Sequence, residues 1–126
     1  MSMKKTVGLA ALGLIAAGAA LAAPASQQDP ELAAQALLTR AQAEIALRDF
    51  RAASRDLEAL RRDYPTSPFA RSGLVLLAYS YLQEGRTAEL VALAAADPGE
   101  IDELPEGQRD LLRLYTAEAM WEEGRT

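Results

Sequence analysis

Three turn positions recur along this chain at nearly equal intervals. Arg48, Gly85 and Gly124 each follow a helix-like apolar segment, and they are 37 and 39 residues apart. Periods of this length are typical of repeat folds, in which a pair of helices cannot bury its apolar side alone and must stack on the next pair. The spacing therefore predicts an all-α fold built from stacked helix hairpins.

Capping residues and prolines predict where the helices begin and end. Asp29 before Pro30 and Ser67 before Pro68 are typical helix starts, Pro65 ends a helix, and Thr87 is expected to cap another. No strand-like alternation or hairpin dipeptide occurs after the first 25 residues. We expect helices over residues 30–47, 50–64, 67–84, 88–96 and 105–123, with a loop over residues 97–104.

The residues around the first two turns follow one pattern. The first unit has a small residue, then an aromatic after the turn, then alanine and two large apolar residues; these are Ala41, Phe50, Ala53, Leu57 and Leu60. The second unit has the helix and turn positions Leu74, Leu77, Ala78, Tyr81 and Gly85. This pattern resembles the tetratricopeptide repeat (TPR), and we take these ten residues as repeat-defining core positions.

A more specific resemblance lies in the segment LRRDYPTSPFARSGLVLLAYSYLQEGR, residues 60–86. It is similar to TPR proteins of the Gram-negative envelope, notably the Tol-Pal coordinator and the outer-membrane assembly lipoprotein. The resemblance implies TPR-like antiparallel helix hairpins stacked as a short right-handed solenoid of about five helices. Two departures are that Arg48 replaces the turn glycine and Thr87 replaces the aromatic residue after the second turn.

The N-terminal residues have the layout of a secretory signal peptide. Two lysines precede an apolar run over residues 7–22, and small residues follow at candidate cleavage sites after Ala22 or Ala25. A membrane anchor is the alternative, but this run is shorter than the roughly 20 residues of a spanning helix. The chain has no cysteine, so we expect neither a lipid nor a disulfide. The predicted location is periplasmic, after secretion across the inner membrane, without lipidation and without a membrane span after cleavage.

The predicted organisation has three parts. A signal peptide over residues 1–25 and a linker over residues 26–29 precede a TPR-like domain over residues 30–126. Within this domain we expect repeat one at 33–66, repeat two at 67–104 and a degenerate capping helix at 105–126. Polar residues such as Arg113, Thr116 and Glu118 favour a solvated lid over the alternative, a chain truncated before a further helix.

Composition excludes several classes of function. The chain has no histidine and no cysteine, which removes the commonest general base, the strongest nucleophile and the usual zinc ligands. Its net charge is −5, which disfavours a nucleic-acid partner. We therefore expect no enzyme activity, no cofactor and no metal.

An acidic run allows three interpretations, namely a calcium loop, a solvated loop or a contact for a basic partner. It comprises Asp97, Glu100, Asp102, Glu103, Glu106 and Asp110.

Trp121 is the main candidate for binding. In the repeat register it aligns with Leu82 and Ile45, on the helix face that lines the concave groove in TPR proteins. The alternative is that Trp121 packs as ordinary core or as an end cap. The predicted partner-binding groove comprises Gln42, Tyr79, Gln83, Glu118, Trp121 and Glu122.

A second cluster of charge lies on the predicted helix 50–64. It carries four arginines, Arg51, Arg55, Arg61 and Arg62. We interpret them as a solvated outer face that pairs with neighbouring acids, as Arg51 would, rather than as an anion site.

These observations predict a non-catalytic, TPR-like adaptor that binds a protein or peptide segment of the cell envelope. The alternative is a structural helical domain that self-associates through the open end of its last helix, as a homo-oligomer. The sequence does not identify the partner.

Overall fold

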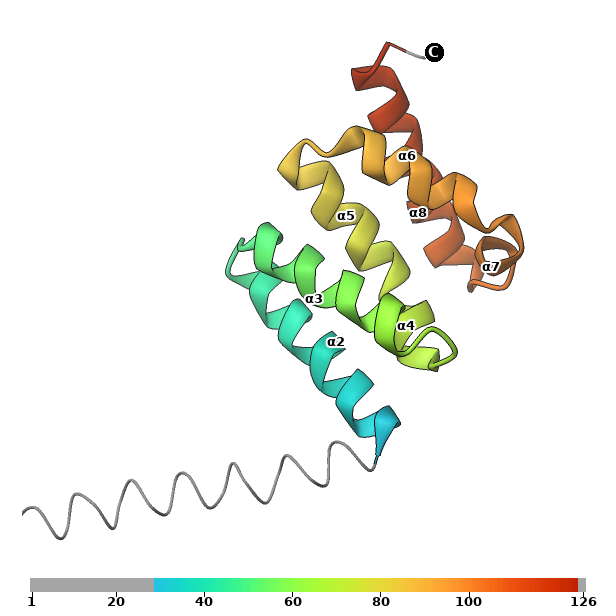
Figure 1. Cartoon of the computed structure of the whole chain (residues 1–126). Coiled ribbons are helices and arrows are strands. Elements are labelled where there is room, and N and C mark those ends of the chain that lie inside the picture. Colours follow the sequence, from blue (N-terminus) through green and yellow to red (C-terminus); the bar gives the residue numbers. More distant parts are fainter. Residues whose placement is uncertain (1–28, 125–126) are drawn as a thin grey trace, which may run out of the picture. The chain divides into compact units, whose positions relative to one another are not determined.

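The computed structural model describes residues 29–124, and the chain divides into two units, residues 1–33 and 34–126. The predicted signal peptide and nearly all of the predicted linker lie outside the described residues. Within the described range every regular element is a helix, which confirms the all-α prediction. The seven helices are α2 (Pro30–Ala46), α3 (Phe50–Asp63), α4 (Pro68–Ser72), α5 (Leu74–Glu84), α6 (Thr87–Ala96), α7 (Pro98–Asp102) and α8 (Glu106–Glu122) (Figure 1).

Helices α2 and α3 form the first hairpin. The Asp49 carboxylate caps α3 by accepting a hydrogen bond from the Ala52 amide at 3.2 Å. Across the pair, the Arg40 guanidinium donates to both Asp56 oxygens, at 2.7 and 2.8 Å. Ala34 and Ala41 of α2 are fully buried, so small residues occupy the covered side of this helix. A bidentate ion pair joins the two helices of the first hairpin.

The first two turns have the same backbone structure. Arg48 and Gly85 both adopt left-handed conformations, with φ of 61° and 74°. The amide of each residue donates to the backbone carbonyl three positions earlier. The amide of the following residue donates to the carbonyl five positions earlier, from Asp49 to Glu44 and from Arg86 to Tyr81, both at 2.8 Å. These are the two bonds of a Schellman motif. Gly124 also has a positive φ, at 73°, and its amide donates to the Trp121 carbonyl, which is the first of these two bonds.

The helix predicted over residues 67–84 is divided in two. Ser67 caps α4 by accepting from the Phe69 amide, as predicted, but Gly73 then separates α4 from α5. A Cβ at Gly73 would lie 3.0 Å from a Leu57 methyl group of α3. The glycine therefore lets this junction pass close to α3, which a continuous helical pattern could not reveal.

Two further predictions about boundaries are wrong. Residues 97–104 are not a loop throughout, because Asp97 accepts from the Glu100 amide and caps the short helix α7. Thr87 does not cap α6; it is the first residue of that helix and makes no capping bond. The two short helices, α4 and α7, account for the difference between the five helices expected and the seven described.

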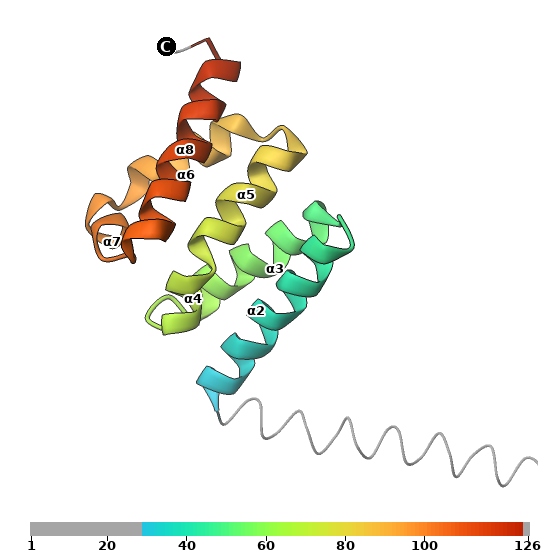
Figure 2. The same ribbon diagram turned by 180° about the vertical axis from the view of Figure 1, so that it is seen from behind.

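The core continues from one helix to the next within residues 34–124. Helix α3 packs on α5, α5 packs on α6 and α8, and α6 packs on α8 (Figure 2). The fully buried side chains come from each of these helices, and the largest are Leu57, Leu60, Leu74, Leu77, Leu90 and Leu112. No helix in the described range is long and apolar enough to span a membrane. The handedness of the stack and the repeat boundaries stay predictions.

Candidate surface for a protein partner on helix α8

Helix α8 exposes a row of large apolar side chains. Leu111 is 43% exposed, Leu114 53% and Trp121 72%. Their spacing of three and seven residues places them on one side of the helix, away from Leu112 and Ala119, which are buried against α5 and α6. The polar outer surface predicted for this helix is thus interrupted by apolar side chains. At this exposure Trp121 does not pack as ordinary core, and its role as a binding anchor stays a prediction.

One hollow on α8 lies at Trp121, and a second hollow adjoins it at Ala117. One, of about 350 Å³, is lined by Ala117, Glu118, Trp121 and Glu122. The other, of about 280 Å³, lies where α6 and α7 meet α8, and it is mostly apolar; its lining residues are Ala94, Ile101, Leu112, Arg113, Thr116, Ala117 and Met120. Because Ala117 lines both, the hollows form one surface. We call the two hollows together with Leu111 and Leu114 the α8 surface.

The α8 surface contains three of the six predicted groove residues, Glu118, Trp121 and Glu122. Tyr79 lies elsewhere. Tyr79 is half-buried in α5, between Phe50 and Tyr115, with ring centroids 5.7 and 5.6 Å away. Burial raises the pKa of Tyr115, and the nearby Tyr79 and Glu118 raise it further. Tyr115 was missed in the sequence because the residues around it match the TPR pattern poorly. Its position three residues after Leu112 and four before Ala119, the buried residues of α8, was the available signal.

The two remaining predicted groove residues are solvated. Gln42 on α2 and Gln83 on α5 are both exposed. No hydrogen bond within residues 29–124 joins either side chain to the α8 surface. The structure therefore gathers Glu118, Trp121 and Glu122, places Tyr79 in an aromatic row with Tyr115, and leaves the two glutamines apart.

Half of the acidic run, three of its six residues, forms ion pairs. Glu100 accepts from Arg61 of α3 at 2.7 Å, Glu103 lies 3.3 Å from Arg71, and Asp110 lies 3.9 Å from Arg113. Within residues 29–124 no cluster of carboxylates is arranged to hold a metal ion. These contacts favour a structural role for the acids of α7.

The two occurrences of the sequence EGRT meet in space. The Thr87 hydroxyl, from the first, donates to a Glu123 carboxylate oxygen, from the second, at 2.9 Å. This bond fixes the start of α6 against the end of α8. Thr87, which replaces the aromatic residue of the repeat pattern, thus bonds to α8 instead of capping its own helix.

The sequence model of the family YfiO, described as outer membrane lipoprotein, matches residues 30–97. The match spans α2 to α6 and covers more than half of the chain. The chain belongs to this family. The match confirms the resemblance to TPR-style proteins of the Gram-negative envelope. No curated protein and no solved structure matches the chain.

The YfiO match also corrects the predicted location. The prediction of an unlipidated periplasmic protein is contradicted, because the family consists of outer membrane lipoproteins. That prediction was based on the absence of cysteine. The 126 residues hold no cysteine, so they do not show where a lipid would be attached.

Proposed function

We propose that this protein is a non-catalytic adaptor of the cell envelope, and that the α8 surface binds a segment of another envelope protein. The observation that carries the proposal is the exposure of Trp121, 72%, beside a hollow on the last described helix. Large aromatic side chains are enriched among the residues that dominate binding energy at protein interfaces. Membership of the YfiO family supports the envelope as the setting.

The chemistry of the surface favours an amphipathic partner segment with basic residues. Leu111, Leu114 and Trp121 offer apolar anchors at helical spacing, and the second hollow is lined mainly by small and apolar side chains. Glu118 and Glu122 contribute two carboxylates to the hollow at Trp121, where no arginine accompanies them. A segment with apolar residues on one side and lysine or arginine along its edge would therefore complement this surface.

Co-purification of the tagged protein after mild crosslinking tests the proposal. Trp121→Ala should lose an envelope partner that the unmodified protein retains, because truncating a central aromatic anchor weakens binding by about 2 kcal/mol, or roughly 30-fold. Leu47→Ala is the matched control, since Leu47 is an equally exposed apolar residue, 80%, located in the first turn and far along the chain from α8. Equal recovery of the partner by all three proteins would reject the α8 surface.

Self-association is a second candidate, and the same row of exposed apolar residues favours it. The chain has a single tryptophan, so its fluorescence reports on the α8 surface without labelling. If copies pair through this surface, the emission should shift to shorter wavelength as the concentration rises, in step with the mass measured by light scattering. A constant spectrum and a monomeric mass would leave only the binding of a different protein.

A further inference from the structure

A hollow beside the turn between α5 and α6 is lined by more arginines than carboxylates. It has a volume of about 460 Å³, many times the roughly 30 Å³ that one water occupies in the liquid. Three arginines and one glutamate line it, together with the buried Ser54; these are Arg51, Arg55, Arg86 and Glu84. A basic site of this kind stands out in a chain whose net charge is −5.

Two of these arginines lack the ion pairs expected from the sequence. Arg51 and Arg55 are one helical turn apart on α3, and within residues 29–124 neither side chain forms an ion pair. The acid nearest to Arg55 in sequence, Asp56, is already held by Arg40 at 2.7 Å. The predicted pairing of Arg51 with neighbouring acids is therefore wrong, and both guanidinium groups are available to a ligand.

The third arginine is held loosely. The Arg86 side chain lies 3.4 Å from Glu58, 3.3 Å from Glu84 and 3.6 Å from Glu89, and it donates to the Ser54 hydroxyl at 3.4 Å. Charge-assisted bonds are usually near 2.7–2.9 Å, as in the Arg40 pair. These contacts thus position the Arg86 guanidinium but leave it able to form shorter hydrogen bonds with a ligand.

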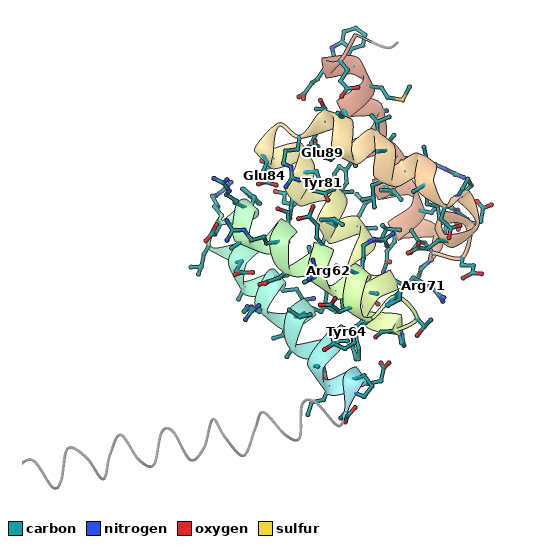
Figure 3. The ribbon with its side chains drawn as sticks, viewed as in Figure 1. Arg62, Tyr64, Arg71, Tyr81, Glu84 and Glu89 are labelled. Carbon is teal, nitrogen blue, oxygen red and sulfur yellow. The ribbon has the colours of Figure 1, made fainter. Side chains whose placement is uncertain are left out.

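The surroundings of Arg86 fix where its charge lies. Its guanidinium carbon is 4.6 Å from the centre of the Tyr81 ring, and the Tyr81 hydroxyl donates to Glu58 at 2.6 Å. Figure 3 shows Tyr81, Glu84 and Glu89 gathered at the turn between α5 and α6. Because the left-handed Gly85 orients this turn, the backbone itself holds Arg86 at the edge of the hollow.

We propose that this hollow, lined by Arg51, Arg55 and Arg86, binds a phosphate group. A planar guanidinium group can bind two phosphate oxygens at once, and three arginines line this hollow, which is open to solvent. The ligand chemistry has two sources, the headgroup of an anionic lipid or a soluble phosphate compound. Membership of a family of outer membrane lipoproteins places the chain near a lipid surface, which makes the headgroup the first source to test.

Two measurements on the full chain test the site. The first compares thermal unfolding in phosphate and in chloride at equal ionic strength; the second compares sedimentation with vesicles of phosphatidylcholine, with and without phosphatidylglycerol. The variant Arg51→Gln/Arg55→Gln removes two lining charges. The control Arg62→Gln/Arg71→Gln removes the same net charge from exposed arginines that do not line the hollow.

Phosphate should raise the midpoint of unfolding by several degrees more in the wild type and the control than in the lining variant, if the site binds with a dissociation constant of about 1 mM and phosphate is present at about 20 mM. Phosphate stabilises proteins generally, and this comparison removes that effect. Retention on phosphatidylglycerol vesicles that falls several-fold only in the lining variant would identify the lipid headgroup. Stabilisation by phosphate without such retention would identify a soluble ligand. If the lining variant and the control respond alike in both assays, the proposal is overturned.

Discussion

The shared geometry of the turns predicts that two substitutions act in opposite directions. Arg48 has a φ of 61° and Gly85 a φ of 74°, and both hold the left-handed position of a Schellman motif. A residue with a Cβ is disfavoured there by about 1–2 kcal/mol relative to glycine. Arg48→Gly should therefore stabilise the fold, and Gly85→Ala should destabilise it.

The magnitudes follow from the backbone. Glycine gains freedom in the unfolded chain, which offsets part of the benefit of Arg48→Gly and leaves about 0.5–1 kcal/mol. Gly85→Ala should lower the free energy of unfolding by about 1 kcal/mol. Backbone strain alone should cause this decrease, because nothing lies within 4 Å of the new Cβ. In a domain of this size each kcal/mol changes the midpoint of thermal unfolding by about 4–8 °C.

Thermal unfolding followed by circular dichroism measures both effects. Arg48→Ala is the control, since it removes the guanidinium but keeps the Cβ, and it should unfold close to the wild type. Stabilisation by Arg48→Ala as large as that by Arg48→Gly would assign the effect to charge. No stabilisation by Arg48→Gly, or a neutral Gly85→Ala, would refute the claim that the two turns are equivalent.

Three further predictions concern stability. Burial, and then a hydrogen bond with Asp56, raise the pKa of Glu44 from 4.5 to about 7. Protonated Glu44 therefore contributes fully to the stability of the fold below pH 4.5, and this contribution is lost as pH rises through 7. Glu44→Gln should flatten the dependence of the unfolding midpoint on pH and, because Glu44 is only partly buried, raise the stability at pH 8 by about 1 kcal/mol. Asp49→Ala removes the cap of α3 and should lower the free energy of unfolding in urea by about 1 kcal/mol. An unchanged free energy of unfolding would contradict the cap. Leu77 is 1% exposed, so Leu77→Ala should lower the free energy of unfolding by about 2–5 kcal/mol in the same assay. A decrease below about 1 kcal/mol would indicate a poorly packed core.

The sequence predicted the helices whose ends carry local signals. Asp29 before Pro30 marks the start of α2, and Ser67 before Pro68 marks that of α4, because side-chain caps and proline act over a few residues. The same signal was present at Asp97 and Pro98, and the helix α7 was missed only because its acidic residues resemble a loop. The break at Gly73 could not be predicted, since it depends on the approach of α3.

The candidate site was predictable in part. The helical period placed Glu118, Trp121 and Glu122 on one region of α8, but periodicity does not say which side a neighbouring helix covers. The exposure of Trp121 and the hollow at Ala117 depend on where α6 and α7 pack, which is set by contacts distant in sequence. The pairing of Arg51 was mispredicted although the sequence held the signal, because no acid stands three or four residues from Arg51 on either side.

The central claim is that the α8 surface contacts another envelope protein. Site-specific photocrosslinking in living cells tests it most directly, with the crosslinking residue placed at position 121 and, as the control, at position 47, which is similarly exposed. We predict a discrete adduct with a different protein from position 121 and none from position 47. An adduct of twice the mass of the chain would indicate self-association, and the absence of any adduct specific to position 121 would contradict the account.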